Sequence, residues 1–109
     1  MIQYEIRFLE PAKNFLDLLD DKTREKVLFN IWKSRETNDP ELFKKLAGEI
    51  WEFRIRFKGK QIRLFAFWDK RSERTTLVIA THGMIKKTQK TPRKEIEKAE
   101  QLRKHYLNV

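Results

Sequence analysis

Clusters of cationic side chains are the residues of this chain best suited to chemistry. Five Lys or Arg and no Asp or Glu lie between His82 and Lys94, and a second basic run extends from Arg54 to Arg63. Cations gathered on one surface repel each other unless an anion is bound, and they attract phosphate groups. The two runs together predict a phosphate-binding site, whereas either run alone would also fit a solvated basic turn.

The charge is distributed unevenly along the chain, whose formal net charge is +9 at pH 7. Residues 1–41 contain seven Lys or Arg and nine Asp or Glu, a net charge of −2. Residues 42–109 contain eighteen and seven, a net charge of +11. The partner is therefore expected to be a polyanion, either nucleic acid or an acidic protein. A membrane is not expected, because the basic positions do not line an amphipathic helix.

The composition predicts one small domain over residues 1–109. Aromatic residues make up 12% of the chain, so a core is available without disulfides, and the absence of Cys fits a reducing compartment. The first residues do not read as a signal peptide and no apolar stretch could span a bilayer, so a cytoplasmic location is expected. Two His and no Cys give no metal-ligand cluster, so neither a metal nor another cofactor is expected.

The first half of the chain predicts a strand and two helices. Residues 2–8 alternate between apolar and polar types, as a strand does. One helix is expected to open at Glu10 and the next at the N-cap Asp21, before a packed connector at 42–46. The predicted apolar faces are Ala12, Phe15, Leu16 and Leu19 in the first helix and Val27, Leu28, Ile31 and Trp32 in the second.

The second half changes to a period of two residues. Strands are predicted from 51 to 58, from 61 to 68 and from 75 to 85, with a hairpin turn around Gly59. A last helix is expected after Thr91 as its N-cap. The predicted order is β-α-α-β-β-β-α. This is an α+β domain in which a helical hairpin packs on a small, mostly antiparallel, twisted sheet.

Strand alternation predicts where the cations gather. If Trp51 and Phe53 face the helices, the basic side chains of the same strand face away from them, and Arg63 joins them across the hairpin. The predicted outward-facing set is Glu52, Arg54, Arg56, Lys58 and Arg63, with Lys86 or Lys87 at its rim. The alternative is that Glu52 and Asp69 pair with some of these cations and that solvent surrounds the rest.

Residues 46–56, 61–65 and 86–92, with Glu95, Ile96 and Ala99 behind them, resemble the HigB-type toxins of the RelE/ParE superfamily. The resemblance covers residues 2–106 and is most specific between 46 and 99. It implies a RelE-like fold and a type II toxin–antitoxin toxin, a metal-independent endoribonuclease that cleaves mRNA on the ribosome and inhibits translation. It also implies a cognate HigA-like helix-turn-helix antitoxin, whose complex would set the oligomeric state.

The resemblance also implies roles for individual residues. Arg63 matches an active-site arginine, and Arg54, Arg56 and Lys86 or Lys87 match basic positions on the sheet and its rim. Arg63 and Arg56 are expected to stabilise the phosphorane formed during RNA cleavage. Proton transfer stays open among Lys86, Lys87, Glu52 and His82. The further RNA-binding candidates are Arg54, Lys58, Lys60, Lys90 and Arg93.

Several alternatives remain open from the sequence. His82 also fits a structural histidine, and Glu52 a salt bridge with Arg54 or Lys58. Trp68 and Phe67 are candidates for stacking on an RNA base, although most aromatic residues are expected in the core. Two functions other than the ribonuclease also remain open: a ParE-like gyrase poison, and a non-catalytic module that binds nucleic acid or antitoxin.

Overall fold

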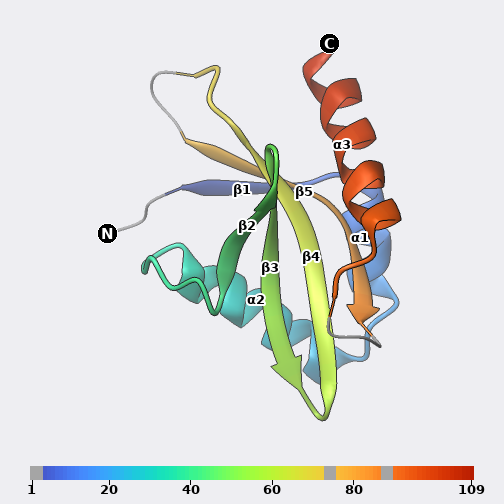
Figure 1. Cartoon of the computed structure of the whole chain (residues 1–109). Coiled ribbons are helices and arrows are strands. Elements are labelled where there is room, and N and C mark those ends of the chain that lie inside the picture. Colours follow the sequence, from blue (N-terminus) through green and yellow to red (C-terminus); the bar gives the residue numbers. More distant parts are fainter. Residues whose placement is uncertain (1–3, 73–75, 87–89) are drawn as a thin grey trace.

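The computed structural model describes residues 4–72, 76–86 and 90–109, which form three helices and a five-stranded mixed sheet (Figure 1). The elements are β1 (Glu5–Phe8), α1 (Glu10–Asp17), α2 (Asp21–Ser34), β2 (Phe43–Ala47), β3 (Ile50–Phe57), β4 (Lys60–Asp69), β5 (Leu77–Lys86) and α3 (Arg93–Leu107). The strand order is β1-β5-β4-β3-β2. Among the described strands, only β1 and β5 pair in parallel, so the expected α+β class is confirmed. None of the helices in the described residues is long and apolar enough to cross a membrane.

Each face of the sheet carries its own apolar cluster, with α1 and α2 on one face and α3 on the other (Figure 1). The first cluster includes Ala12, Leu16, Val27, Ile31, Phe53, Ile55, Leu64 and Val78. The second consists of Ile50, Phe65, Phe67, Ile79 and Ala99, with Ile96 and Tyr106 packed against it. The alternation of β3 therefore divides its side chains between two layers, as the sequence predicts for Trp51 and Phe53.

The predicted connector at 42–46 is wrong, because most of it forms the edge strand β2. Phe43 pairs with Phe53 and Lys44 pairs with Glu52, and the register shifts between Lys45 and Ala47. Phe43 is buried in the first cluster. The order of the described elements is thus β-α-α-β-β-β-β-α, with one strand more than the sequence predicts.

Helix α2 begins one residue earlier than expected and buries a different stripe. Asp20, not Asp21, is the N-cap, and its carboxylate accepts a hydrogen bond of 2.8 Å from the Thr23 N–H. Leu28 and Trp32 are 41% and 53% exposed, so their assignment to the apolar face is wrong. The buried positions of α2 are Thr23, Val27, Asn30, Ile31 and Ser34. Ser34 remains in the interior because its hydroxyl bonds to the Tyr4 hydroxyl at 2.6 Å.

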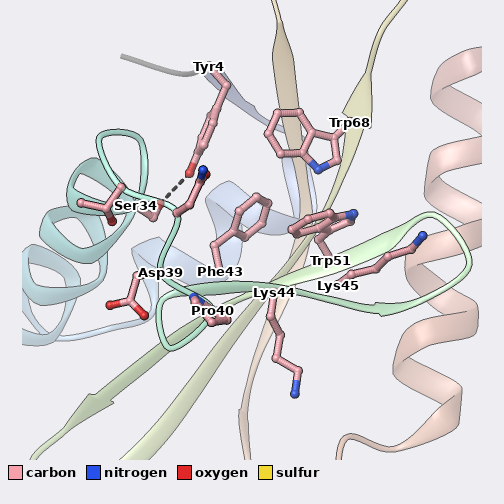
Figure 2. Close-up of a pocket in the computed structure, with 11 residues that line it drawn as sticks. Tyr4, Ser34, Asp39, Pro40, Phe43, Lys44, Lys45, Trp51 and Trp68 are labelled. Carbon is pink, nitrogen blue, oxygen red and sulfur yellow. Dashed lines mark hydrogen bonds between the residues drawn. The ribbon is translucent and has the colours of Figure 1, made fainter. Parts of the chain in front are cut away.

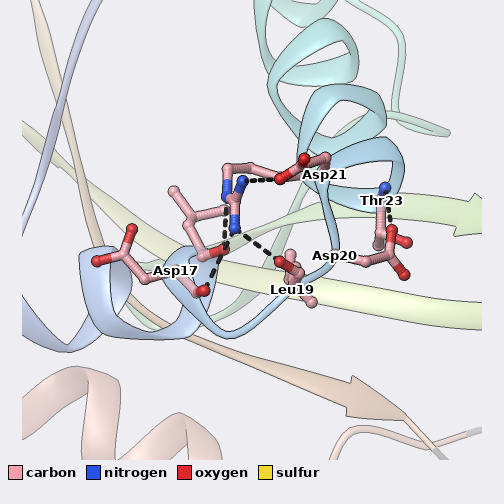
Figure 3. A network of polar contacts seen from close by, with 7 residues as sticks. Asp17, Leu19, Asp20, Asp21 and Thr23 are labelled. Carbon is pink, nitrogen blue, oxygen red and sulfur yellow. Dashed lines mark hydrogen bonds and ion pairs between the residues drawn. The ribbon is translucent and has the colours of Figure 1, made fainter.

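The turn between α1 and α2 is fixed by Arg24. Its guanidinium donates to the backbone carbonyls of Leu16 (2.9 Å), Leu19 (2.6 Å) and Asp17 (3.2 Å) (Figure 3). The last carbonyls of a helix have no partner within the helix, so these bonds satisfy groups that would otherwise need water. Arg24 also pairs with Asp21 at 3.0 Å. One side chain of α2 is thereby bound to the end of α1 and to the turn between the two helices.

Helix α3 also begins differently from the sequence prediction. Pro92 occupies the N-cap without a side-chain hydrogen bond, so Thr91 is not the cap. The Thr91 hydroxyl instead donates to Glu52 Oε1 at 3.3 Å. The residue assigned to local helix capping therefore connects the start of α3 to β3.

Phe15 of α1 lies directly over Gly83 of β5. A Cβ added at Gly83 would lie 2.3 Å from Cδ2 of Phe15, closer than real Cβ atoms approach. Glycine is needed here for the close approach of the helix, since Gly83 has no positive φ. The contact holds α1 against the strand that also carries His82 and Lys86.

Replacing Gly83 with Ala is expected to lower the free energy of unfolding by about 1–3 kcal/mol, because the Phe15 ring must move. The same substitution in a Phe15→Ala background should cost little, since the ring is gone. Urea denaturation of the four proteins measures both values. Equal costs in the two backgrounds would contradict the contact as the cause.

Candidate anion-binding site

Glu52 lies at the centre of the basic residues on the sheet face turned away from α1 and α2. It is only 3% exposed, so the expectation that it faces outward with the cations is wrong. Its Oε1 lies 3.4 Å from Nε of Arg63, and its Oε2 lies 3.8 Å from Nε of Arg54. A buried carboxylate needs such partners. The salt bridge with Arg54 that the sequence suggested is present, whereas the closer partner is Arg63.

Arg63 of β4 is 1% exposed, so the expectation that it faces outward is wrong too, and its guanidinium is held on several sides. Nη1 donates to the Ile62 carbonyl at 3.0 Å, and Nη2 donates to Gln61 Oε1 at 3.1 Å. Burial lowers the pKa of Arg63, Glu52 opposes the shift, and the neighbouring Arg54 and Arg56 add to it. Arg54 and Arg63 are directly opposite in the β3–β4 pairing. A like-charged pair in that position is unfavourable without an anion between or beside them.

An open cavity of about 230 Å³ lies against these arginines. Its lining consists of Lys26, Asn30, Glu41, Leu42, Arg54, Arg56 and Arg63. Four of these residues are cationic and one is acidic, so the cavity favours an anion. Guanidinium groups are suited to phosphate because their planar donors can bind two oxygens at once. We call this cavity, together with Glu52 and Lys86, the anion site.

Lys86 reaches the same group from β5. It pairs with Gln61 in the β4–β5 register, next to Arg63. Burial lowers the pKa of Lys86, and Arg63, Arg54 and Lys44 lower it further while Glu52 opposes the shift. A lysine with a lowered pKa gives up its proton more readily near neutral pH, which suits proton transfer.

His82 lies apart from this cluster, beneath α3, and is 2% exposed. Its Nδ1 is 3.2 Å from the Thr81 hydroxyl, its Nε2 is 3.4 Å from Glu95 Oε2, and its ring packs on Phe65 at 4.9 Å. Burial lowers the pKa of His82, Lys98 adds to the shift, and Glu95 opposes it. These contacts are those of a histidine that connects α3 to the sheet.

The remaining candidate residues for RNA binding and proton transfer lie in different parts of the fold. Lys58 and Lys60 lie exposed at the β3–β4 turn near Asp20, whose pKa is lowered mainly by hydrogen bonds from Thr23 and also by these lysines. Arg93 is exposed on α3 and pairs with Glu97 at 3.3 Å. Lys90 is exposed next to Thr91. Lys87 lies outside the described residues.

The stacking candidates Phe67 and Trp68 and the acidic candidate Asp69 all lie away from the arginines around Glu52. Phe67 is fully buried under α3, whereas Trp68 is half-buried on the opposite face. Asp69 pairs with Arg71 at 2.9 Å and not with the arginines around Glu52. The alternative in which Asp69 neutralises those cations is therefore wrong.

Among the residues that sequence reasoning missed are Lys26 of the cavity lining and, beside Glu52, Lys44 and Thr91. Lys44 lies opposite Glu52 because β2 is a strand, and Lys26 comes from the half-buried side of α2. Thr91 was assigned to a helix cap. Residues 43–46 do not alternate between apolar and charged types as a half-buried strand does, so the sequence pattern does not point to Lys44.

Comparison with protein families gives a match over residues 14–104 to the family described as Phage derived protein Gp49-like (DUF891). The matched range includes α2, the whole of β2–β5 and the residues around Glu52. No curated protein matches the chain.

Replacing Arg63 with Met is expected to lower the free energy of unfolding by about 3–5 kcal/mol, because Glu52 stays buried without its closest cation. Adding Glu52→Leu should recover at least half of that loss. Arg93→Met breaks an exposed pair whose side chains are 91% and 67% accessible, and should cost less than about 1 kcal/mol. Urea denaturation measures five proteins: the wild type, Arg63→Met, Glu52→Leu, the double variant and Arg93→Met. Additive losses for Arg63 and Glu52 would show that they are not coupled.

The stability of the protein should fall as the pH drops below 6.5, the ordinary pKa of His82. The folded-state pKa is lower than this value, so the unfolded chain binds the proton first, and acid favours unfolding. His82→Gln should flatten the dependence between about pH 7 and about pH 5, whereas His105→Gln, on the exposed end of α3, should not. Urea denaturation across this range is the measurement. Identical slopes for the two variants would exclude His82 as the cause.

Proposed function

We propose that this chain, a member of the phage-derived Gp49-like family, is an endoribonuclease toxin of a type II toxin–antitoxin system. The Gp49-like family is a RelE/toxin-like family. Its substrate would be messenger RNA, cut on the ribosome, so that translation stops. The arrangement of the anion site supports this proposal. Arg54, Arg56 and Arg63 converge on one open cavity, with a single buried carboxylate among them.

The proposed reaction is an attack by the ribose 2′-oxygen on the neighbouring phosphorus. The 2′-hydroxyl loses its proton, a phosphorane forms, and the 5′-oxygen leaves with a proton, giving a cyclic phosphate. The arginines of the cavity would stabilise the negative charge that develops on the phosphorane. Lys86 is the proton-transfer candidate that the lowered pKa favours. Glu52 acts through Arg63 and Arg54, whose guanidinium groups it positions.

The partner proposed for this toxin is a cognate HigA-like helix-turn-helix antitoxin with an acidic or amphipathic segment. Charge complementarity supports such a segment, because the chain carries a net charge of +9. The oligomeric state would then be set through the antitoxin complex. In this proposal the fold is RelE-like and the toxin is HigB-type.

Binding without cleavage is the second candidate function. His82 and Glu52 are 2% and 3% exposed and do not line the cavity, so two of the candidates for proton transfer do not reach it directly. A non-catalytic module would use the same cations to hold RNA or an acidic protein. The two candidates differ in whether removing Lys86 stops strand cleavage or only weakens binding.

Lys86→Met and Arg56→Ala are each expected to reduce messenger RNA cleavage by at least about tenfold, since each removes a cation that would act on the transition state. Lys13→Met, on the exposed side of α1, should cleave like the wild type. Toe-printing of a translated message with purified protein measures the cuts. Unfolding in urea checks that each variant is folded.

Two outcomes would contradict the ribonuclease. Gyrase-dependent DNA breaks without codon-specific cuts would favour the gyrase poison. Absence of both, with RNA or antitoxin binding retained, would favour the non-catalytic module.

A further inference from the structure

A second cavity, of about 410 Å³, lies on the opposite side of β2 from Glu52. We call it the aromatic pocket. Four aromatic rings form its inner wall (Figure 2). Phe43, Trp51 and Trp68 come from β2, β3 and β4, and Tyr4 immediately precedes β1. The lining is Tyr4, Ser34, Thr37, Asn38, Asp39, Pro40, Phe43, Lys44, Lys45, Trp51 and Trp68. None of these residues belongs to the cavity of the anion site.

The rings of the aromatic pocket hold each other in place. Trp51 and Trp68 are nearly perpendicular, with centroids 5.6 Å apart, and Tyr4 meets Trp68 edge-on at 5.2 Å. Phe43 stacks on Phe53 beneath them at 4.2 Å. Trp51 and Trp68 are only half-buried, so ring surface remains accessible within a rigid wall. A flat aromatic ligand could stack there without first ordering the protein.

Two polar groups of the lining residues could pair with a ligand that has both acceptors and donors. Nε1 of Trp68 is buried and has no hydrogen-bond partner within the described residues. An indole N–H can only donate, so it calls for an acceptor. The Asp39 carboxylate, which accepts from the Glu41 N–H at 2.9 Å, lies on the lining and can accept a further donor. The edge of a nucleobase offers both kinds of group.

Lys44 connects the aromatic pocket to the anion site. It lines the pocket, and it is also directly opposite Glu52 in the backbone register of β2 and β3. Lys45 follows it on the same strand and is exposed (Figure 2). Cations along this border can hold the phosphates of a strand that passes from one cavity to the other.

We propose that the aromatic pocket binds one unpaired nucleobase of an RNA strand, whose neighbouring phosphates lie on Lys44, Lys45 and the anion site. The inference rests on the proposed function and adds to it a base-binding subsite on the other face of the sheet. An aromatic side chain of an acidic peptide is the competing occupant. RNA is favoured because the cationic border leads directly to the guanidinium groups, which suit phosphate.

Tryptophan fluorescence can test this inference without requiring cleavage. In a Trp32→Phe background, the remaining emission comes from Trp51 and Trp68, both in the pocket. The probe is a 2′-O-methyl RNA hexamer, which cannot be cut because its attacking hydroxyl is blocked. The hexamer is expected to quench this emission. Lys45→Glu should weaken binding at least about tenfold, and Trp68→Phe, which keeps a ring but removes the N–H, several-fold.

Lys13→Glu is the matched control, because it changes the net charge by the same amount on exposed α1. Equal weakening by Lys13→Glu and Lys45→Glu would overturn the pocket as an RNA site, as would no quenching at all. Tighter binding of the peptide Glu-Glu-Phe-Glu-Glu, which carries no tryptophan of its own, than of the hexamer would assign the pocket to a protein partner and overturn it too. Urea denaturation confirms that each variant is folded.

The outcome can be separated from that of the proposed function. Pocket-dependent quenching by the hexamer, with no cleavage of translated message by the wild type, would retain the base-binding site and remove the ribonuclease. Cleavage by the wild type, with hexamer binding that ignores Lys45 and Trp68, would retain the ribonuclease and remove the base-binding site.

Discussion

The burial of one carboxylate, that of Glu52, is the constraint on which the functional half of the sheet depends. A carboxylate taken out of water is stable only beside cations and hydrogen-bond donors. Arg63 and Arg54 supply the cations, and Thr91 supplies a hydroxyl at 3.3 Å. Arg63 is itself nearly inaccessible, so each member of the pair requires the other. Glu52 can hold two guanidinium groups near each other, but one negative charge does not balance all the cations around it.

The same carboxylate also connects the start of α3 to the sheet. Thr91 bonds to Glu52 immediately before the helix begins, which fixes its start beside β3. From there α3 packs on the apolar half of this face, over Phe65 and Phe67, and His82 pairs with Glu95 beneath it. The arginine-bearing half continues into an open cavity. One face thus has a closed half that stabilises the fold and a cationic half that attracts an anion.

Strand periodicity was enough to predict much of this arrangement. The alternation in β3 and β4 placed Arg54 and Arg63 together, and the β3–β4 hairpin followed from Gly59. Periodicity could not show β2, whose residues do not alternate. It also could not show the burial of Glu52, which involves Thr91, distant in sequence, as well as Arg63 and Arg54. In α2, apolar spacing suggested Leu28 and Trp32. The helix instead buries Asn30 and Ser34, and the hydrogen bond to the Tyr4 hydroxyl offsets the cost of burying the Ser34 hydroxyl.

The edge strand β2 would allow the two faces of the sheet to act on the proposed RNA strand. Lys44 and Lys45 are consecutive residues of an extended strand, so their side chains leave toward opposite faces. Lysines on an exposed edge discourage pairing with another sheet. Here they also form a cationic border shared by the aromatic pocket and the anion site. A polyanion that crosses β2 would neutralise these lysines, which otherwise discourage pairing of the edge strand. The bound polyanion would itself cover that edge, so binding need not expose β2 to pairing with another sheet.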